Sequence, residues 1–314
     1  MDRKSVSVKS YANIAIVKYW GKADVKKMIP ATSSISLTLE NMYTKTDLSF
    51  LPEGAQGDEF YIDGQLQNQQ EHAKMTKIID FFRREGQPFV KIETNNNMPT
   101  AAGLSSSSSG LSALVKACNQ LFDFGLDQKE LAQYAKFASG SSARSFFGPL
   151  SAWDKDSGDI YQVKTDLDLS MIMLVLNDQP KTISSREGMQ RCAETSSDFQ
   201  AWIDQSALDY RVMLNYLAAN DFAKVGRLAE ENALRMHSTT RSANPPFSYL
   251  TEESYQAMDF VRSLREKGYD CYFTMDAGPN VKVFCQTKDL GTLAEIFGQN
   301  YRTIVSKTKD PAHD

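Results

Sequence analysis

Five consecutive serines, Ser105–Ser109, stand directly before a stretch with helical spacing, and this arrangement constrains the fold most strongly. The full run reads Pro99-Thr-Ala-Ala-Gly-Leu-Ser-Ser-Ser-Ser-Ser-Gly110. An amphipathic helix repeats its apolar side chains at i, i+3, i+4 and i+7, and the next positions do so at Leu111, Leu114, Val115 and Cys118. A β-rich stretch at 90–93 comes before the run. The sequence therefore predicts a strand, a loop of small residues and a helix, in that order.

This loop is suited to bind phosphate groups. Free N–H groups and the positive end of the helix dipole attract anions at a helix N-terminus. Small residues let a polyphosphate approach the backbone, and serine hydroxyls can bind Mg²⁺. It is not a Walker A loop, because no Gly-Lys-Ser/Thr follows at the required spacing. On composition alone, a serine-rich N-cap or a linker is an equal alternative, although the adjoining helix argues against a linker.

Composition indicates a folded protein large enough for two domains that share a cleft. The chain has 314 residues, of which 41% are hydrophobic and 24% charged. A formal net charge of −4 argues against a nucleic-acid partner. The four cysteines are far apart, which favours reduced thiols over a zinc site. Neither an apolar leader nor a membrane span is visible, so we expect a soluble, cytoplasmic protein with no membrane partner.

Periodicity predicts a mixture of strands and helices. Strands are expected at 6–8, 35–39, 46–50, 90–93, 169–176, 271–275 and 281–285. Helices are expected near 75–82, 111–118, 131–138, 204–237 and 258–264. The order lacks regular βαβ alternation, which favours an α+β architecture over a doubly wound sheet.

Two lysines flank an aromatic turn near the N-terminus, in Asn13-Ile-Ala-Ile-Val-Lys18-Tyr-Trp-Gly-Lys22. Their charges and the aromatic edge could hold an anionic substrate. The alternative is a strand that ends in an exposed aromatic turn with solvated lysines. Taken alone, this stretch favours that alternative.

Small hydroxyl residues precede an arginine in Ser139-Gly-Ser-Ser-Ala-Arg144. A guanidinium group can grip two oxygens of a carboxylate or phosphate at once. A helix C-cap followed by a surface arginine explains the same stretch about equally well.

A carboxylate stands at the end of a predicted strand in Met275-Asp-Ala-Gly-Pro-Asn-Val281. A general base must reach one hydroxyl at hydrogen-bond distance, so a stiff element is the place to expect it. An ordinary β-turn with Asp in its usual position is the alternative. Without the other motifs, the turn would be favoured.

Together and in this order, these segments resemble the diphosphomevalonate decarboxylase family. That family belongs to the superfamily of galactokinase, homoserine kinase, mevalonate kinase and phosphomevalonate kinase. The resemblance extends from about Ser10 to Gln286, and it includes Ser184-Ser-Arg-Glu-Gly-Met189 and Asn244-Pro-Pro-Phe-Ser-Tyr-Leu250. It implies an α+β, two-domain, small-molecule-kinase-like fold with a deep cleft. An ATP-binding domain is expected at 1–178, and a ferredoxin-like α/β domain with the catalytic aspartate at 179–314.

The resemblance also implies an activity and its residues. The family converts (R)-5-diphosphomevalonate with ATP to isopentenyl diphosphate, ADP, phosphate and CO₂, through phosphorylation of the C3 hydroxyl. Asp276 falls on the aspartate that acts on this hydroxyl, Arg144 on the arginine that contacts the carboxylate, and Lys18 on a catalytic cation. Substrate binding falls on Tyr19, Trp20, Gly21, Lys22, His72, Ser139, Gly140, Ser141, Ser142, Ala143, Arg144, Ser185 and Arg186. ATP binding falls on Ala102, Gly103, Leu104, Ser105, Ser106, Ser107, Ser108 and Lys181, with Mg²⁺ near Ser106 or Ser107. A homodimer is implied as well.

Two departures and two rival functions accompany this resemblance. Many relatives read Ala-Ser-Ser-Ala where this chain has only serines, and His72 stands roughly where some relatives carry a substrate-contacting arginine. A sister kinase that stops after phosphorylation is the nearest rival, but such kinases usually end in a glycine-rich third motif. A silent phosphate-ligand binding protein is the other rival. CO₂ release would exclude the kinase, and ADP formation would exclude the binding protein.

Overall fold

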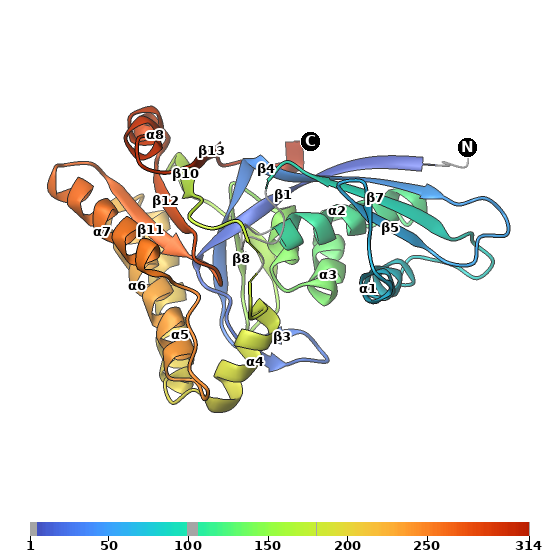
Figure 1. The fold of residues 1–314 in the computed structure, drawn as a ribbon, viewed down its shortest axis with the longest axis horizontal. Helices are drawn as coiled ribbons and strands as arrows, with labels where there is room; N and C mark the ends of the chain where they lie inside the picture. The colour runs from blue at the N-terminus through green and yellow to red at the C-terminus, as the bar shows by residue number, and fades with distance from the viewer. Residues whose placement is uncertain (1–4, 99–105, 180, 314) are drawn as a thin grey trace.

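Two main β-sheets with helices packed on them, and a small two-stranded sheet, make up the described part of the molecule (Figure 1). The computed structural model describes residues 5–98, 106–179 and 181–313. The larger sheet lies toward one end in Figure 1 and the smaller sheet toward the other, and β1 and β4 extend between them. Strands and helices mix without βαβ repetition, which confirms the expected α+β class.

The N-terminal half builds the larger sheet, with the strand order β6-β5-β7-β4-β8-β9 and β1 paired to β4. Its strands are β1 (Ser5–Val17), β4 (Ser34–Phe50), β5 (Glu59–Ile62), β6 (Gln65–Leu66), β7 (Val90–Asn96), β8 (Leu150–Trp153) and β9 (Ile160–Val163). An apolar core joins one sheet face to α1 (Gln69–Ile79), α2 (Ser106–Leu121), α3 (Gln128–Ala138) and the 3-10 helix η1 (Ser142–Phe146). The predicted strand–loop–helix unit is thus β7 followed by α2.

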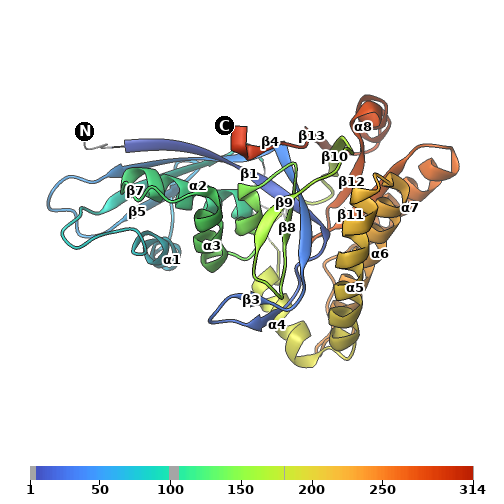
Figure 2. The same cartoon turned by 180° about the vertical axis from the view of Figure 1, so that it is seen from behind.

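The smaller sheet has the order β11-β12-β10-β13. Its strands are β10 (Leu169–Leu174), β11 (Cys271–Met275), β12 (Val281–Gln286) and β13 (Thr303–Lys307). Figure 2 shows the long helices of this half side by side; the helices are α4 (Ser185–Thr195), α5 (Phe199–Ala218), α6 (Phe222–Arg241), α7 (Glu252–Glu266) and α8 (Leu290–Gly298). The remaining elements are the hairpin strands β2 (Lys22–Asp24) and β3 (Ile29–Pro30) and the 3-10 turns η2 (Thr287–Asp289) and η3 (Pro311–His313).

The position of β10 bears on the domain boundary. The expected boundary at 178/179 stays a prediction. However, β10 pairs with β12 and β13 of the smaller sheet, although it precedes residue 178. We therefore propose a boundary between β9 and β10, near residues 164–168.

Two elements differ from the predicted ones. The expected helix at 204–237 is two helices, because Asn220 has a positive φ of 56° and Asp221 caps the next helix through the N–H of Lys224. The strands expected at 35–39 and 46–50 are parts of one strand, β4.

Among the described residues, no helix combines the length and the apolar composition that crossing a membrane needs.

A β-bulge in β1 turns polar side chains toward the helix side of the larger sheet. The pairing register of β1 with β4 shifts between Tyr11 and Asn13. Before the shift, even-numbered residues face the helices, since the Ser10 hydroxyl contacts that of Ser112 on α2 at 2.7 Å. After it, Asn13 faces the same side and donates to Ser145 Oγ at 2.8 Å. One extra residue exchanges the two faces of a strand, so this bulge aims Asn13 and Ala15 at the cavity described below.

Glycine 226 lets α6 pack closely on the smaller sheet. A Cβ at this position would lie 2.1 Å from the Tyr272 ring. Replacing a helical glycine by alanine ordinarily stabilises a helix by about 0.5–1 kcal/mol. We expect Gly226→Ala to lower the free energy of unfolding by about 1–3 kcal/mol instead, because the ring must move. Urea denaturation measures this change.

Gly291→Ala is the matched control for that experiment. Gly291 also lies in a helix, α8, but a Cβ there meets no atom within 4 Å. It should therefore leave the stability unchanged or raise it by up to about 1 kcal/mol. Equal effects of the two substitutions would contradict the packing argument.

Candidate active site

A large cavity is lined by residues from both halves of the chain. Its volume is about 1010 Å³, and side chains of β1, α1, α2, α4 and the turn after β11 contribute to its wall. Among the described residues of this wall, basic side chains exceed acidic ones: Lys18, Lys22, Lys26, Lys74, Lys77, Arg144, Lys181 and Arg186 stand against Glu71 and Asp276. A cavity with this charge attracts polyanionic ligands.

Asp276 carries its carboxylate at the cavity wall, directly after β11. Lys18 Nζ lies 2.7 Å from Oδ1, and Lys282 Nζ lies 3.3 Å from Oδ2. The Asp276 side chain is 22% exposed, so it remains accessible from the cavity. Burial by itself raises the pKa of Asp276, but the charges of Lys18 and Lys282 outweigh it and hold the pKa well below its usual range. The carboxylate is therefore ionised at neutral pH in spite of its burial.

Lys18 is a buried cation at the end of β1. Its side chain is only 3% exposed, and Nζ also donates to Ala15 O at 2.7 Å. Its backbone N–H donates to Asn232 Oδ1 of α6 at 2.8 Å, and Asn232 in turn donates to the buried Asp209 at 2.8 Å. Burial lowers the pKa of Lys18 to about 8, although Asp276 partly opposes the shift. The alternative of a solvated lysine is wrong.

This pKa predicts a loss of activity at alkaline pH. With a pKa of about 8, the Lys18 amine is mostly protonated and positively charged below pH 8 and mostly neutral above it. If the reaction needs the Lys18 charge, kcat/KM should fall about tenfold per pH unit above about pH 8. A pH series of initial rates with the two substrates that the family resemblance implies measures this limb. A kcat/KM that stays constant up to pH 10 would contradict the assignment.

Arg144 is held inside the protein by serines of β4. Its Nε donates to Ser36 Oγ at 2.5 Å, and Nη1 donates to Ser34 Oγ at 2.7 Å. The residue is 2% exposed, so the alternative of a surface arginine is wrong. Burial lowers its pKa to about 10, and the group remains charged at neutral pH. Two serines thus fix the guanidinium while its outer edge lines the cavity.

The turn after Lys18 is packed rather than exposed. Trp20 is 3% exposed and donates from Nε1 to Thr239 Oγ1 at 3.1 Å. Gly21 has a φ of +106°, and a Cβ there would lie 2.6 Å from the Phe199 ring, so only glycine fits. The Tyr19 ring packs on Trp153, with ring centroids 5.4 Å apart. The expected aromatic turn therefore becomes a fixed part of the cavity wall.

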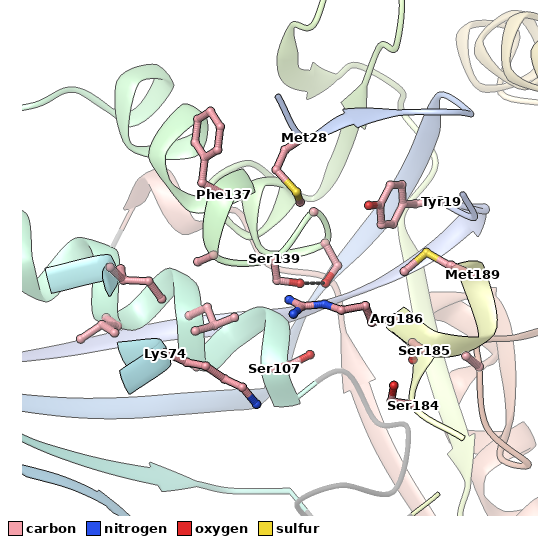
Figure 3. A pocket seen from close by; sticks show the side chains of 18 of the residues that line it. Tyr19, Met28, Lys74, Ser107, Phe137, Ser139, Ser184, Ser185, Arg186 and Met189 are labelled. Carbon is pink, nitrogen blue, oxygen red and sulfur yellow. Dashed lines mark hydrogen bonds between the residues drawn. The ribbon is translucent and has the colours of Figure 1, made fainter. Parts of the chain in front are cut away.

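Hydroxyl groups from α3 and α4 face each other across the cavity. Asn13 Nδ2 donates to Ser141 O at 2.8 Å, which fixes the segment after α3. Figure 3 shows Ser139 hydrogen-bonded within this segment, with the Arg186 side chain from α4 reaching toward it. On the α4 side, Lys181 Nζ donates to Ser185 Oγ at 2.9 Å. These donors line the same cavity.

Comparison with known proteins decides the family. A family model for the diphosphomevalonate decarboxylase-like N-terminal domain matches residues 10–163, and one for the mevalonate 5-diphosphate decarboxylase C-terminal domain matches residues 171–312. The chain belongs to the diphosphomevalonate decarboxylase family. The resemblance carried by the motifs is thus confirmed.

Individual members of this family agree over nearly the whole chain. The diphosphomevalonate decarboxylase of Candida albicans is 30% identical over 94% of this chain and 89% of its own length. A solved structure of mevalonate pyrophosphate decarboxylase from Streptococcus pyogenes is 69% identical, with a TM-score of 0.95 over 99% of this chain and 98% of that one. A solved structure of MDDEF in complex with MVAPP, AMPPCP and magnesium is 38% identical, with a TM-score of 0.91 over 98% and 97%. The expected two-domain kinase-like fold is therefore confirmed.

Most of the residues that the family resemblance selects line the cavity. They are Lys18, Tyr19, Trp20, Lys22, Ser107, Ser139, Gly140, Ser141, Arg144, Lys181, Ser185, Arg186 and Asp276. Gly21, Ser108, Ser142 and Ala143 do not line it, and the last three are fully buried. Ala102, Gly103, Leu104, Ser105 and the side chain of Ser106 lie outside the described residues. Their roles stay predictions.

His72 does not line the cavity. The cavity-lining residues of α1 are Glu71, Lys74, Met75, Lys77 and Ile78, and all of these except Lys77 follow the spacing of one helix face. His72 lies about 100° away around the helix axis, so Lys74 is better placed for an anion. Figure 3 shows Lys74 extending from α1 toward the first turn of α2.

Three further residues, which were not selected from the sequence motifs, lie in the cavity wall or contact Asp276: Asn13, Ser184 and Lys282. Asn13 stands in the quoted N-terminal motif and Ser184 caps α4. Lys282 interrupts the apolar Val281-Lys-Val-Phe284, and a lysine at a buried strand position is the signal that could have identified it.

Proposed function

We propose that this chain catalyses the ATP-dependent decarboxylation of (R)-5-diphosphomevalonate to isopentenyl diphosphate, ADP, phosphate and CO₂. Family membership over both domains supports the activity. So does a relative's complex with MVAPP (mevalonate diphosphate), the ATP analogue AMPPCP and magnesium. The observation that carries the proposal is the Asp276–Lys18 pair at 2.7 Å, which joins the two halves of the chain at the cavity wall.

Asp276 and Lys18 are proposed to prepare the C3 hydroxyl. A tertiary alcohol is a poor nucleophile, so its lone pair must be aligned with the γ-phosphoryl group. The ionised Asp276 carboxylate accepts the hydrogen bond of this hydroxyl and takes its proton as the O–P bond forms. Lys18 offsets the negative charge that gathers on the reacting oxygens.

Arg144 is proposed to hold the substrate carboxylate. When the C3–O bond breaks, the phosphate leaves with its electron pair. The C1–C2 bond then supplies the electrons of the new C2=C3 double bond, and CO₂ departs. Because Ser34 and Ser36 fix the guanidinium, it can orient the carboxylate without following it. The lysines of the wall stabilise the departing phosphate.

Two groups of wall residues suit the two substrates. The side chains of Phe60, Ile62, Ile92, Leu111 and Leu114 form an apolar region for the adenine ring. Lys22, Ser139 and Arg186 form a polar region for the diphosphate of mevalonate diphosphate. Between them, the N-terminal turn of α2 with Ser107 faces the ATP phosphates.

The donors around this turn fit Mg²⁺ carried by ATP. Mg²⁺ usually keeps several waters and uses one or two protein ligands together with phosphate oxygens. Within the described residues, no group of three or more His, Cys, Asp or Glu side chains could hold a metal ion. We propose Ser107 as a hydroxyl ligand of the ion; the other candidate, Ser106, has its side chain outside the described residues. When bound, the ion neutralises phosphate charge.

An assay with three substrates tests the proposal. Purified protein with ATP and Mg²⁺ receives mevalonate, its monophosphate or its diphosphate, and ADP and CO₂ are measured together. We expect equal amounts of both products from the diphosphate only. ADP without CO₂ would indicate the sister kinase, and binding without ADP would indicate a silent binding protein.

We further propose a cytoplasmic homodimer. The four cysteines are free and buried, as expected for a protein of a reducing compartment. The dimer rests on the family resemblance. Light scattering during gel filtration should give about twice the chain mass of 35.2 kDa.

A further inference from the structure

Lys282 is a fully buried cation that the proposed reaction does not use. Its side chain is 0% exposed, and it is not among the residues that line the cavity. It stands on β12 opposite Thr274 of β11 and Met173 of β10. Burying a lysine costs more than burying an apolar residue of similar volume unless the charge is paired. The packing alone therefore gives no reason for a lysine here.

The position of Lys282 on the sheet aims it at Asp276. Val281, Val283 and Cys285 alternate with it and belong to the core of the smaller sheet. Lys282 therefore faces the opposite side. That side meets β1, since Thr274 Oγ1 lies 3.3 Å from Ala15 O. There Lys282 Nζ reaches Asp276 Oδ2 at 3.3 Å.

One carboxylate thus faces several cations. Lys18 holds one oxygen of Asp276 and Lys282 the other. The titratable groups that interact with Asp276 from the surrounding elements are Lys18 after β1, Lys282 of β12, Arg144 of η1, Lys181 before α4 and His237 of α6, whose imidazole is neutral because burial lowers its pKa to about 3. Lys18, Arg144 and Lys181 of this set line the cavity, whereas Lys282 does not. It therefore acts through its neighbours instead of on the substrate.

We propose that Lys282 is a positioning residue of the reaction, which fixes Oδ2 of Asp276 and sets the charge balance of the Asp276–Lys18 pair. This inference rests on the proposed function. The Lys282 charge favours the ionised carboxylate and disfavours the protonated form of Lys18, so it lowers the pKa of both groups. Losing this charge should raise both pKa values.

Kinetics of Lys282→Met and Lys282→Gln test the proposal. Both variants remove the charge, and the second retains a hydrogen-bond donor. We expect kcat with mevalonate diphosphate to fall at least about tenfold while KM changes less than about threefold, because Lys282 does not touch the substrate. The alkaline limb that Lys18 causes near pH 8 should move up by about one pH unit. An unmoved limb in both variants overturns the proposal, as does a loss confined to KM.

Val283→Ala provides the matched control. Val283 is fully buried on the same strand but faces the other side of the sheet. Its truncation should lower the melting temperature and leave the alkaline limb in place. If it moves the limb as far as Lys282→Met does, the shift reports loosened packing, and the charge argument is overturned.

A stability measurement separates this inference from the proposed activity. In the wild type, the pKa of Lys18 is lowered from 10.5 to about 8 on folding. Between these pH values the unfolded chain binds more protons, so the free energy of unfolding rises with pH. This rise should be smaller in Lys282→Met, whose Lys18 has a more ordinary pKa. An equal rise in both proteins overturns the inference, whereas a wild type that releases no CO₂ overturns only the proposed function.

Discussion

Asp276→Asn should reduce the release of CO₂ by about 10²–10⁴-fold while the protein still binds mevalonate diphosphate. The amide has nearly the size of the carboxylate, but it cannot take the proton of the C3 hydroxyl. The substitution also removes a negative charge from a cavity that binds anions, so binding should be unchanged or tighter. Rapid-quench assays of CO₂ and titration calorimetry with the substrate measure the two quantities.

Asp276→Asn leaves Lys18 and Lys282 without their shared partner, so its folding must be checked. Unpaired buried charges are destabilising, and the melting temperature of the variant should fall. Asp259→Asn is the control, because Asp259 is an exposed acid on α7 whose ion pair, within the described part of the chain, is with Arg262. A folded Asp276→Asn protein with turnover within threefold of the wild type would remove Asp276 from the mechanism.

Arg144→Met should separate phosphorylation from decarboxylation. If the guanidinium holds the substrate carboxylate, its loss should slow CO₂ release by about 10²–10³-fold. The phosphoryl group moves onto the C3 oxygen rather than the carboxylate, so ADP formation should suffer less. The ratio of ADP to CO₂ in the first turnover should therefore rise well above one. Single-turnover assays of both products measure it.

Supporting variants refine the Arg144 prediction. Arg144→Lys keeps the charge but cannot bind both Ser34 and Ser36 through a planar fork, so it should recover only part of the loss. Arg262→Met on the exposed face of α7 is the control for removing an arginine. If the rates of ADP formation and CO₂ release fall by the same factor in Arg144→Met, the arginine already acts at or before phosphoryl transfer. That result would contradict the prediction.

Local patterns predicted local structure well. The spacing of apolar residues identified α1, α2, α3 and α7, and the strands around Asp276 are β11 and β12. Each of these signals lies within one element, where periodicity reports a buried face. The patterns did not show that β10 joins the smaller sheet, because strand pairing depends on distant parts of the chain.

The site was harder to predict than the fold. Taken alone, the stretch around Lys18 favoured a solvated turn. It is buried because Trp202 of α5 donates to Trp20 O at 3.0 Å and Asn232 of α6 accepts from the Lys18 N–H. Those partners are about 180 and 210 residues away along the chain. Only the family resemblance brought the motifs together before the structure did.

Two individual residues show the limits of reasoning by motif. His72 was selected by its approximate alignment with an arginine of relatives, but rotation around α1 places Lys74 at the cavity instead. Lys282 directly follows the Met275–Val281 motif, and no local pattern indicates its role, because its burial depends on the pairing of three strands. Alignment of positions does not report which way a side chain faces.

A crystal structure of the protein with mevalonate diphosphate, a non-hydrolysable ATP analogue and Mg²⁺ would show whether Asp276 contacts the reacting hydroxyl. We expect an Asp276 carboxylate oxygen about 2.6–3.2 Å from the C3 hydroxyl, with the γ-phosphate of the analogue on the far side of that hydroxyl. An Asp276 carboxylate pointing away from the hydroxyl in the closed, fully loaded complex would contradict it.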